Sequence, residues 1–315
     1  MKLLAGAACA ALLAGTLTAC SASGDDGRTS VVASFYPAQF LAERIGGDEV
    51  SVETLTSPGT EAHDLELTAK QVVAVNEADV LVYLTNFQEA VDHAVDDADR
   101  DAATTVDMAE GVEELAGEEG HDHDHDHGED GHDHEGHDHD HGGIDPHVWL
   151  DPANMVTAAG HVRDALVEAD PDHAETFEAN ADELITELEA LDADFTQGLA
   201  SCERTEFVTS HAAFGHLAHA YDLTQVPISG LDPQSEPTTA ALAEVTEQVK
   251  EHGLTTVFTE RLASSALAET VARETGAATA VLDPIEGLSD ETSDEDYVSL
   301  MRQNLDALTK ANGCR

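Results

Sequence analysis

The segment from His121 to His141, HDHDHDHGEDGHDHEGHDHDH, most restricts how this chain can fold. Nine of its residues are histidine, and all the others are aspartate, glutamate or glycine. Because the segment contains no apolar side chain, it cannot contribute to a hydrophobic core. We therefore expect a solvated, mobile loop over residues 116–143, inserted into an otherwise globular chain.

Imidazole nitrogens and carboxylate oxygens are also ligands for divalent first-row metals. The loop is thus either an acidic linker with incidental histidines or a low-affinity metal collector. The collector would use His121, His123, His125, His127, His132, His134, His137, His139 and His141. A collector implies that the rest of the chain contains a dedicated metal site.

The charge balance restricts the partners. Lysine and arginine number 13 against 65 aspartates and glutamates, a formal net charge of -52. Such a surface repels nucleic acids and anionic substrates and attracts cations. We expect no nucleic-acid partner, although solubility or adaptation to salt explains the acidic residues outside the loop equally well.

Residues 1–20 read as an export signal. The apolar stretch from Leu3 to Leu17 is too short to span a bilayer comfortably. It ends in Leu-Thr-Ala-Cys, which resembles a bacterial lipobox and implies that residues 1–19 are a lipoprotein signal peptide. Cleavage would leave Cys20 as the lipidated first residue, anchored by several acyl chains. Residues 20–30 then form a flexible tether. The alternative is a plain secretory signal with an incidental cysteine.

Two cysteines remain after export, Cys202 and Cys314. In an oxidising extracytoplasmic compartment, a disulfide is favoured over two free thiols. It would close a loop of about 110 residues, for which the chain-entropy model gives about 4 to 5 kcal/mol. A metal-binding role is the weaker interpretation, because neither cysteine lies in a CxxC motif.

Apolar, β-branched runs alternate with helical patterns on both sides of the loop. Strands are predicted at 29–35, 50–55, 79–84 and 104–106, and again at 205–209, 225–228, 255–259 and 278–282. This alternation predicts an α/β fold with two lobes, each a mostly parallel sheet flanked by helices. At 315 residues the chain is long enough for two such lobes, which we place at 31–169 and 202–315.

Between the lobes, apolar residues recur at helical spacing over residues 171–199. A helix of this length spans about 40 Å, enough to run the height of both lobes. We interpret residues 170–201 as a rigid connecting helix; an ordinary core helix has the same spacing.

Four candidate metal ligands lie where strands end, at the edge where parallel α/β sheets bind ligands. They are His63, His147, His211 and Asp283. Two belong to each predicted lobe, so the metal would sit between the lobes. Three imidazoles and a carboxylate complete a tetrahedral shell with no open position, which suits binding and transport rather than hydrolysis.

Several segments resemble the zinc and manganese solute-binding lipoproteins of bacterial ABC importers. They are VVASFYPAQFLAERIGG, SPGTEAHDLELTAKQV, DPHVWLDP, FVTSHAAFGHLAHAYDL, VFTE and LDPIEGL. The resemblance implies two lobes joined by one long helix, a metal at their interface, ligands at the four positions above, and a membrane permease as partner of a monomeric receptor. Manganese members usually carry glutamate at the third position, so His211 and the histidine loop favour zinc.

Some alternatives stay open. Water, Glu61 or Glu260 would complete the shell if Asp283 does not. His216 and His219, three residues apart on a predicted helix at 212–220, are either an accessory site or, as we favour, surface residues.

The expected function is therefore that of an extracytoplasmic, non-enzymatic zinc receptor that delivers zinc to an ABC permease. Its setting is a cell surface or a periplasm. A manganese receptor of the same family is the first alternative. A zinc hydrolase is disfavoured, because the chain has no HExxH motif. A zinc buffer or surface adhesin that uses only the loop is the remaining alternative.

Overall fold

The computed structural model describes residues 27–117 and 143–315. The predicted signal peptide, Cys20 and the nine loop histidines lie outside the described residues. Within the described part, the α/β class with two mostly parallel sheets is confirmed.

The first lobe contains a four-stranded parallel sheet in the order β2-β1-β3-β4. The strands are β1 (Thr29–Ala33), β2 (Val50–Thr54), β3 (Val80–Tyr83) and β4 (Thr105–Asp107). In the central strand β1, Val31 pairs with Val52 of β2 and Val80 of β3. The helices of this lobe are α1 (Tyr36–Gly46), α2 (Ala69–Glu77), α3 (Glu89–Asp96) and α4 (Pro152–Ala169). Helices cover both faces of the sheet, so β1 and β3 are buried along most of their length rather than at alternate residues.

The second lobe repeats this arrangement with the order β6-β5-β7-β8. The strands are β5 (Glu206–Thr209), β6 (Thr224–Pro227), β7 (Thr256–Thr259) and β8 (Ala278–Val281). The helices are α6 (Gly215–Ala220), α7 (Thr239–Glu251), α8 (Ala266–Thr275) and α9 (Tyr297–Asn312). Helix α6 begins three residues later than the sequence predicts, because the His211 carbonyl, which would accept the first helical bond, accepts from the side chains of Thr209 and Gln225 instead.

Short 3₁₀ helices complete the described elements: η1 (Gly47–Glu49), η2 (Ala102–Thr104), η3 (Val148–Leu150) and η4 (Pro171–His173). None of the helices in residues 27–117 and 143–315 combines the length and hydropathy needed to cross a bilayer.

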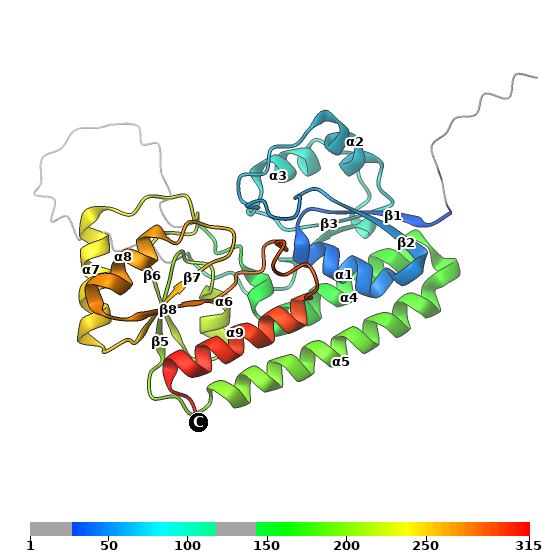
Figure 1. Cartoon of the computed structure of the whole chain (residues 1–315). Helices are drawn as coiled ribbons and strands as arrows, with labels where there is room; N and C mark the ends of the chain where they lie inside the picture. The colour runs from blue at the N-terminus through cyan, green and yellow to red at the C-terminus, as the bar shows by residue number, and fades with distance from the viewer. Residues whose placement is uncertain (1–26, 118–142) are drawn as a thin grey trace, which may run out of the picture.

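The longest helix, α5 (Ala174–Leu199), runs beneath both lobes (Figure 1). Its 26 residues span about 39 Å. It packs against α1 and α4 of the first lobe and against α9 of the second. The buried side chains follow helical spacing: Phe177, Ala181, Leu184, Leu188, Leu191, Phe195 and Leu199. The helix therefore both connects the lobes and supplies a shared core.

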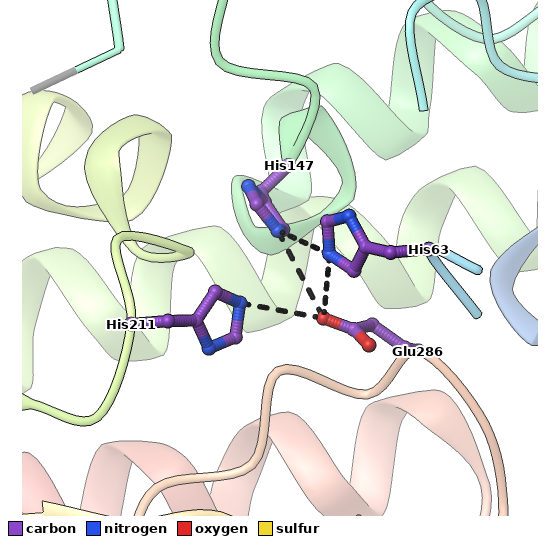
Figure 2. A group of neighbouring side chains, drawn as sticks. All are labelled: His63, His147, His211 and Glu286. Carbon is purple, nitrogen blue, oxygen red and sulfur yellow. Dashed lines mark hydrogen bonds and ion pairs between the residues drawn. The ribbon is translucent and has the colours of Figure 1, made fainter. Parts of the chain in front are cut away.

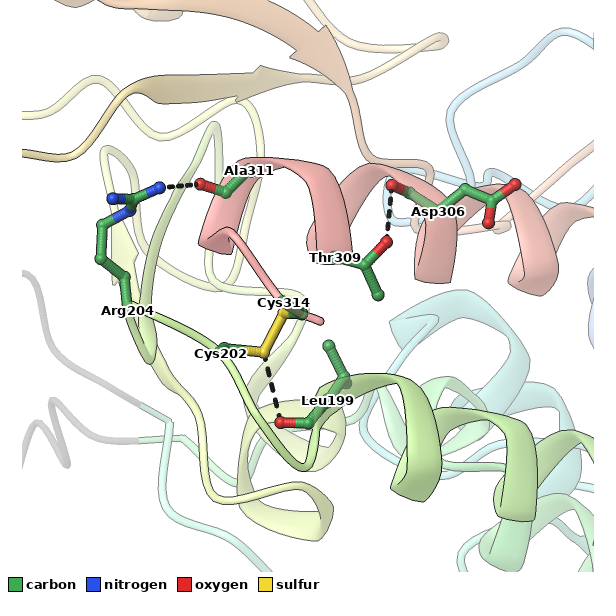
Figure 3. The surroundings of a disulfide bond; sticks show 7 residues. All are labelled: Leu199, Cys202, Arg204, Asp306, Thr309, Ala311 and Cys314. Carbon is green, nitrogen blue, oxygen red and sulfur yellow. Dashed lines mark hydrogen bonds between the residues drawn. A yellow bond between two sulfur atoms is a disulfide. The ribbon is translucent and has the colours of Figure 1, made fainter.

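A disulfide joins Cys202, just after α5, to Cys314, just after α9 (Figure 3). The cysteines are 112 residues apart in sequence. Beside them, the backbone N–H groups of Glu203 and Arg204 both donate to the carbonyl of Asn312. This contact fixes the chain terminus to the end of the connecting helix.

Candidate metal centre

Three histidines and one glutamate converge between the two lobes (Figure 2). His63 lies in the loop between β2 and α2, and His147 immediately precedes η3. His211 follows β5, and Glu286 follows β8. One atom from each of these four residues lies within 4.8 Å of the other three.

Four of the six distances between these atoms are close to those of a tetrahedral zinc shell. His63 Nε2 lies 3.3 Å from His147 Nε2. Glu286 Oε1 lies 3.5 Å from His63 Nε2, 3.8 Å from His147 Nε2 and 3.5 Å from His211 Nε2. Zinc–ligand bonds of 2.0–2.1 Å at tetrahedral angles place ligand atoms about 3.4 Å apart.

The centre is shielded from solvent. His147, His211 and Glu286 are buried, and His63 is partly buried. His211 Nε2 and Glu286 Oε1 make no hydrogen bond, although both atoms are buried. Buried polar atoms are rarely left without a partner, and a cation at the centre would satisfy both.

Two carboxylates behind the histidines set the orientation of the imidazoles. Asp145 Oδ1 accepts from His147 Nδ1 at 2.8 Å and from the His147 backbone N–H at 3.0 Å. Glu260 Oε1 accepts from His211 Nδ1 at 2.8 Å and from the His211 backbone N–H at 3.2 Å. With Nδ1 engaged as a donor, Nε2 of each ring is the atom directed to the centre, where it can bind a cation once it carries no proton.

The Asp145 carboxylate also explains the glycine in the SHAAFG segment. A Cβ at position 215 would collide with Asp145 Oδ2, so any other residue would displace the carboxylate that orients His147. The next residue, His216, is buried, and its Nε2 lies 3.1 Å from the Asp145 carbonyl oxygen. The expectation that His216 is a surface residue is therefore wrong, whereas His219 is exposed.

The pKa values of the three buried groups are shifted in different directions. Burial opposes protonation of His211, but Glu260 and Glu286 together raise the pKa of His211 to about 10. Burial lowers the pKa of His147, despite Asp145. Burial acts to raise the pKa of Glu286, but His211 and His63 hold that pKa well below its usual value. A divalent cation that binds here therefore displaces a proton from His211.

Asp283, the fourth ligand expected from the sequence, is not part of this group in the structure. Its Oδ2 lies 3.0 Å from Arg261 Nε, and its Oδ1 accepts from the Ile285 N–H at 2.9 Å. Glu286, three residues further on, lies there instead. Glu286 was not among the predicted ligands. The prediction took ligands from the residues that come directly after a strand, and Glu286 lies further along the chain.

The two alternative ligands also lie outside the group of four. Glu260 holds His211 from behind, and Glu61 Oε1 accepts from the His63 backbone N–H at 2.9 Å. Both carboxylates, with those of Asp283 and Glu286, line a small pocket beside the histidines. A useful signal in the sequence was the second acidic residue of LDPIEGL, Glu286, which also follows the last strand of the sheet.

The profile of the family described as "Zinc-uptake complex component A periplasmic" matches residues 31–311. The chain belongs to this family of solute-binding proteins. It is 42% identical over 303 residues to the zinc-binding lipoprotein AdcA of Streptococcus pneumoniae, covering 95% of this chain and 59% of that protein. It is 38% identical over 291 residues to the high-affinity zinc uptake system protein ZnuA of Bacillus subtilis, covering 91% of this chain and 89% of that protein.

The fold is likewise similar to solved structures. The crystal structure of the Zn(II)-bound ZnuA-like domain of Streptococcus pneumoniae AdcA superposes with a TM-score of 0.73 at 37% identity. The match covers 91% of this chain and 99% of that domain. This chain thus spans less than two thirds of full-length AdcA and corresponds to its ZnuA-like part.

Proposed function

We propose that this protein captures Zn²⁺ between its lobes and delivers it to the membrane permease of an ABC importer. The observation that carries the proposal is the group of His63, His147, His211 and Glu286, whose ligand atoms all lie within 4.8 Å of one another. The names of the relatives, a zinc-binding lipoprotein and a zinc uptake protein, support zinc as the cargo.

The composition of the site favours zinc over manganese. Three imidazole nitrogens and one carboxylate oxygen suit zinc, whereas manganese prefers oxygen ligands and a larger coordination number. A manganese receptor is the alternative within the same family. Four protein ligands also fill a tetrahedral shell, so no position is left for a reactive water, and we propose binding without catalysis.

The proposed setting is extracytoplasmic. Lipid on Cys20 would hold the receptor at the membrane, and the tether that follows would let it reach the permease. The excess of acidic residues would concentrate cations near the surface, and the histidine loop would add low-affinity sites.

Zinc titration of three variants tests the proposal. Deleting residues 121–141 should leave one tightly bound zinc per chain, because the four-residue centre is intact. His211→Ala should abolish tight binding and keep the weak sites. His219→Ala, a matched change of an exposed histidine on the nearby helix α6, should leave tight binding unchanged.

The same titrations with Mn²⁺ should show weaker binding than with Zn²⁺. Near-total loss of zinc binding in the loop deletion would contradict the receptor and support a zinc buffer or adhesin that uses only the loop. Tight Mn²⁺ binding in preference to Zn²⁺ would instead support the manganese receptor.

A further inference from the structure

The turn that carries Glu286 has an unfavourable backbone. Ile285 has a φ of 57°, in the left-handed region, and its side chain is fully buried. A β-branched residue rarely adopts this conformation, because its side chain crowds the backbone. The turn redirects the chain after β8, so that Glu286 rather than Asp283 faces the histidines. Contacts elsewhere must therefore hold it.

Contacts within the second lobe hold one side of the turn. Asp283 Oδ1 accepts from the Ile285 N–H at 2.9 Å, and Arg261 pairs with the other oxygen of the same carboxylate. Asn304 of α9 accepts from the Asp283 N–H at 2.8 Å and donates to the Asp283 carbonyl at 2.7 Å. The residue that we expected to bind metal thus braces the turn.

A contact from the first lobe holds the other side. Trp149 Nε1 donates to the Pro284 carbonyl at 2.7 Å, and both groups are buried. In return, the Tyr297 hydroxyl donates to the Trp149 carbonyl at 2.6 Å. Trp149 lies two residues after His147. The segment that carries one candidate ligand, His147, is therefore also hydrogen-bonded to the turn that carries another, Glu286.

We propose that Trp149 and Asp283 are positioning residues for Glu286. Trp149 holds the Ile285 turn from across the lobe interface and Asp283 holds it from within, so that the Glu286 carboxylate stays in the metal shell. This inference rests on the proposed function, in which Glu286 is a ligand. It predicts that losing either brace weakens metal binding through Glu286 alone.

The experiment compares Trp149→Phe, Asp283→Ala and Glu286→Ala in the full chain. Phenylalanine keeps a ring to pack against Phe35 and Phe87 but removes the N–H donor. The matched control is Tyr221→Phe, which keeps the ring stacked on Phe195 and removes a hydroxyl that donates to Asp192, neither of which belongs to the metal group. Zinc affinity is measured by competition, and Co²⁺ is used as a visible-absorption probe of the coordination shell.

We expect Trp149→Phe and Asp283→Ala each to weaken zinc binding about 10- to 100-fold, as changes behind a metal ligand do. Their Co²⁺ spectra should shift toward that of Glu286→Ala. Adding Trp149→Phe to Glu286→Ala should cause little further loss of affinity, because both changes act on metal binding through the same ligand. Tyr221→Phe should change neither affinity nor spectrum.

Unchanged affinity and Co²⁺ spectra in both single variants, or losses that add fully in the double variant, would overturn the positioning role. If Trp149→Phe does not fold, Asp283→Ala carries the same test from the other side of the turn. Wild-type zinc binding in Glu286→Ala would instead refute Glu286 as a ligand, and with it the four-ligand site of the proposed function.

Discussion

Buried carboxylates in this acidic protein are stabilised only where hydrogen bonds or a cation compensate for their lost hydration. Asp145 and Glu260 each accept two N–H groups from the histidine that they orient. The carboxylate of Asp92, in α3, has fewer hydrogen bonds. Its Oδ2 accepts from the Asn86 N–H at 3.0 Å, but its Oδ1 is buried without a hydrogen-bond partner.

Burial, opposed by the Asn86 N–H and assisted by the nearby charges of Asp107 and Asp96, raises the pKa of Asp92 to about 6. His93 acts weakly in the opposite direction. Asp92 therefore holds its proton more strongly in the folded protein than in the unfolded chain. The stability that this proton contributes is complete below about pH 4, the pKa of an unfolded aspartate, and is lost as pH rises through 6.

Asp92→Asn should consequently raise the thermal midpoint at pH 7.5 and have little effect at pH 4. Asparagine keeps an oxygen acceptor for Asn86 and removes the charge. Because Asp92 is only partly buried, we expect a gain of about 1 kcal/mol, or about 2 °C, after allowing for screening. Scanning calorimetry at both pH values measures it, with exposed Asp99→Asn as control. A gain of equal size at both pH values would contradict the assignment.

At the scale of single elements, α5 is held by its apolar stripe rather than by its ends. Leu188 is fully buried near the middle of the helix, whereas the adjacent Glu189 is exposed. The helix contributes core side chains to both lobes and no member of the metal group. A change in the core of this helix should therefore lower the stability of the protein without changing its zinc affinity.

Leu188→Ala should lower the free energy of unfolding by about 2 to 4 kcal/mol, because it leaves a cavity in a core that cannot fully collapse. Glu189→Ala, one residue along, should change it by less than about 0.5 kcal/mol. Denaturant unfolding measures both variants. Zinc stoichiometry and affinity should be preserved in each, and loss of tight zinc binding in Leu188→Ala would show that the packing of α5 also sets the metal site.

At the scale of the whole molecule, the disulfide closes most of the second lobe into a ring. Cys202 and Cys314 are separated by 112 residues, and the bond ties the terminus to the end of α5 (Figure 3). Its main effect is on the unfolded chain, which loses conformational freedom. The metal centre lies at the lobe interface and includes neither cysteine.

Replacing both cysteines by serine should lower the free energy of unfolding by up to about 4 to 5 kcal/mol, the loop-closure value for a ring of this size. Equilibrium unfolding in denaturant measures the loss, with the reduced wild-type protein as the comparison. One tight zinc per chain should remain under native conditions. An unchanged unfolding midpoint would show that the bond does not restrict the unfolded chain as the entropy model requires.

The sequence supports most of the architecture because its patterns are local. The β-branched runs at Val31 and Val208, followed by helical spacing, predict parallel strands buried on both faces. Parallel strands end at one edge, so the strand pattern alone predicts that His211 lies at the lobe interface. The start of α6 could not be placed as well, because the His211 carbonyl accepts from the side chain of the distant Gln225 rather than from a helical N–H.

By itself, the sequence determined the two α/β lobes, the connecting helix and the placing of three histidines between the lobes. These features follow from strand periodicity and strand ends, which depend on residues that are neighbours in the chain. Only the tertiary structure decided which carboxylate joins the histidines. Asp283 and Glu286 lie three residues apart and carry the same charged group. The choice depends on the backbone of Ile285, held partly by a hydrogen bond from Trp149 that spans 135 residues. No local pattern encodes that bond, because it forms only when the two lobes have packed together.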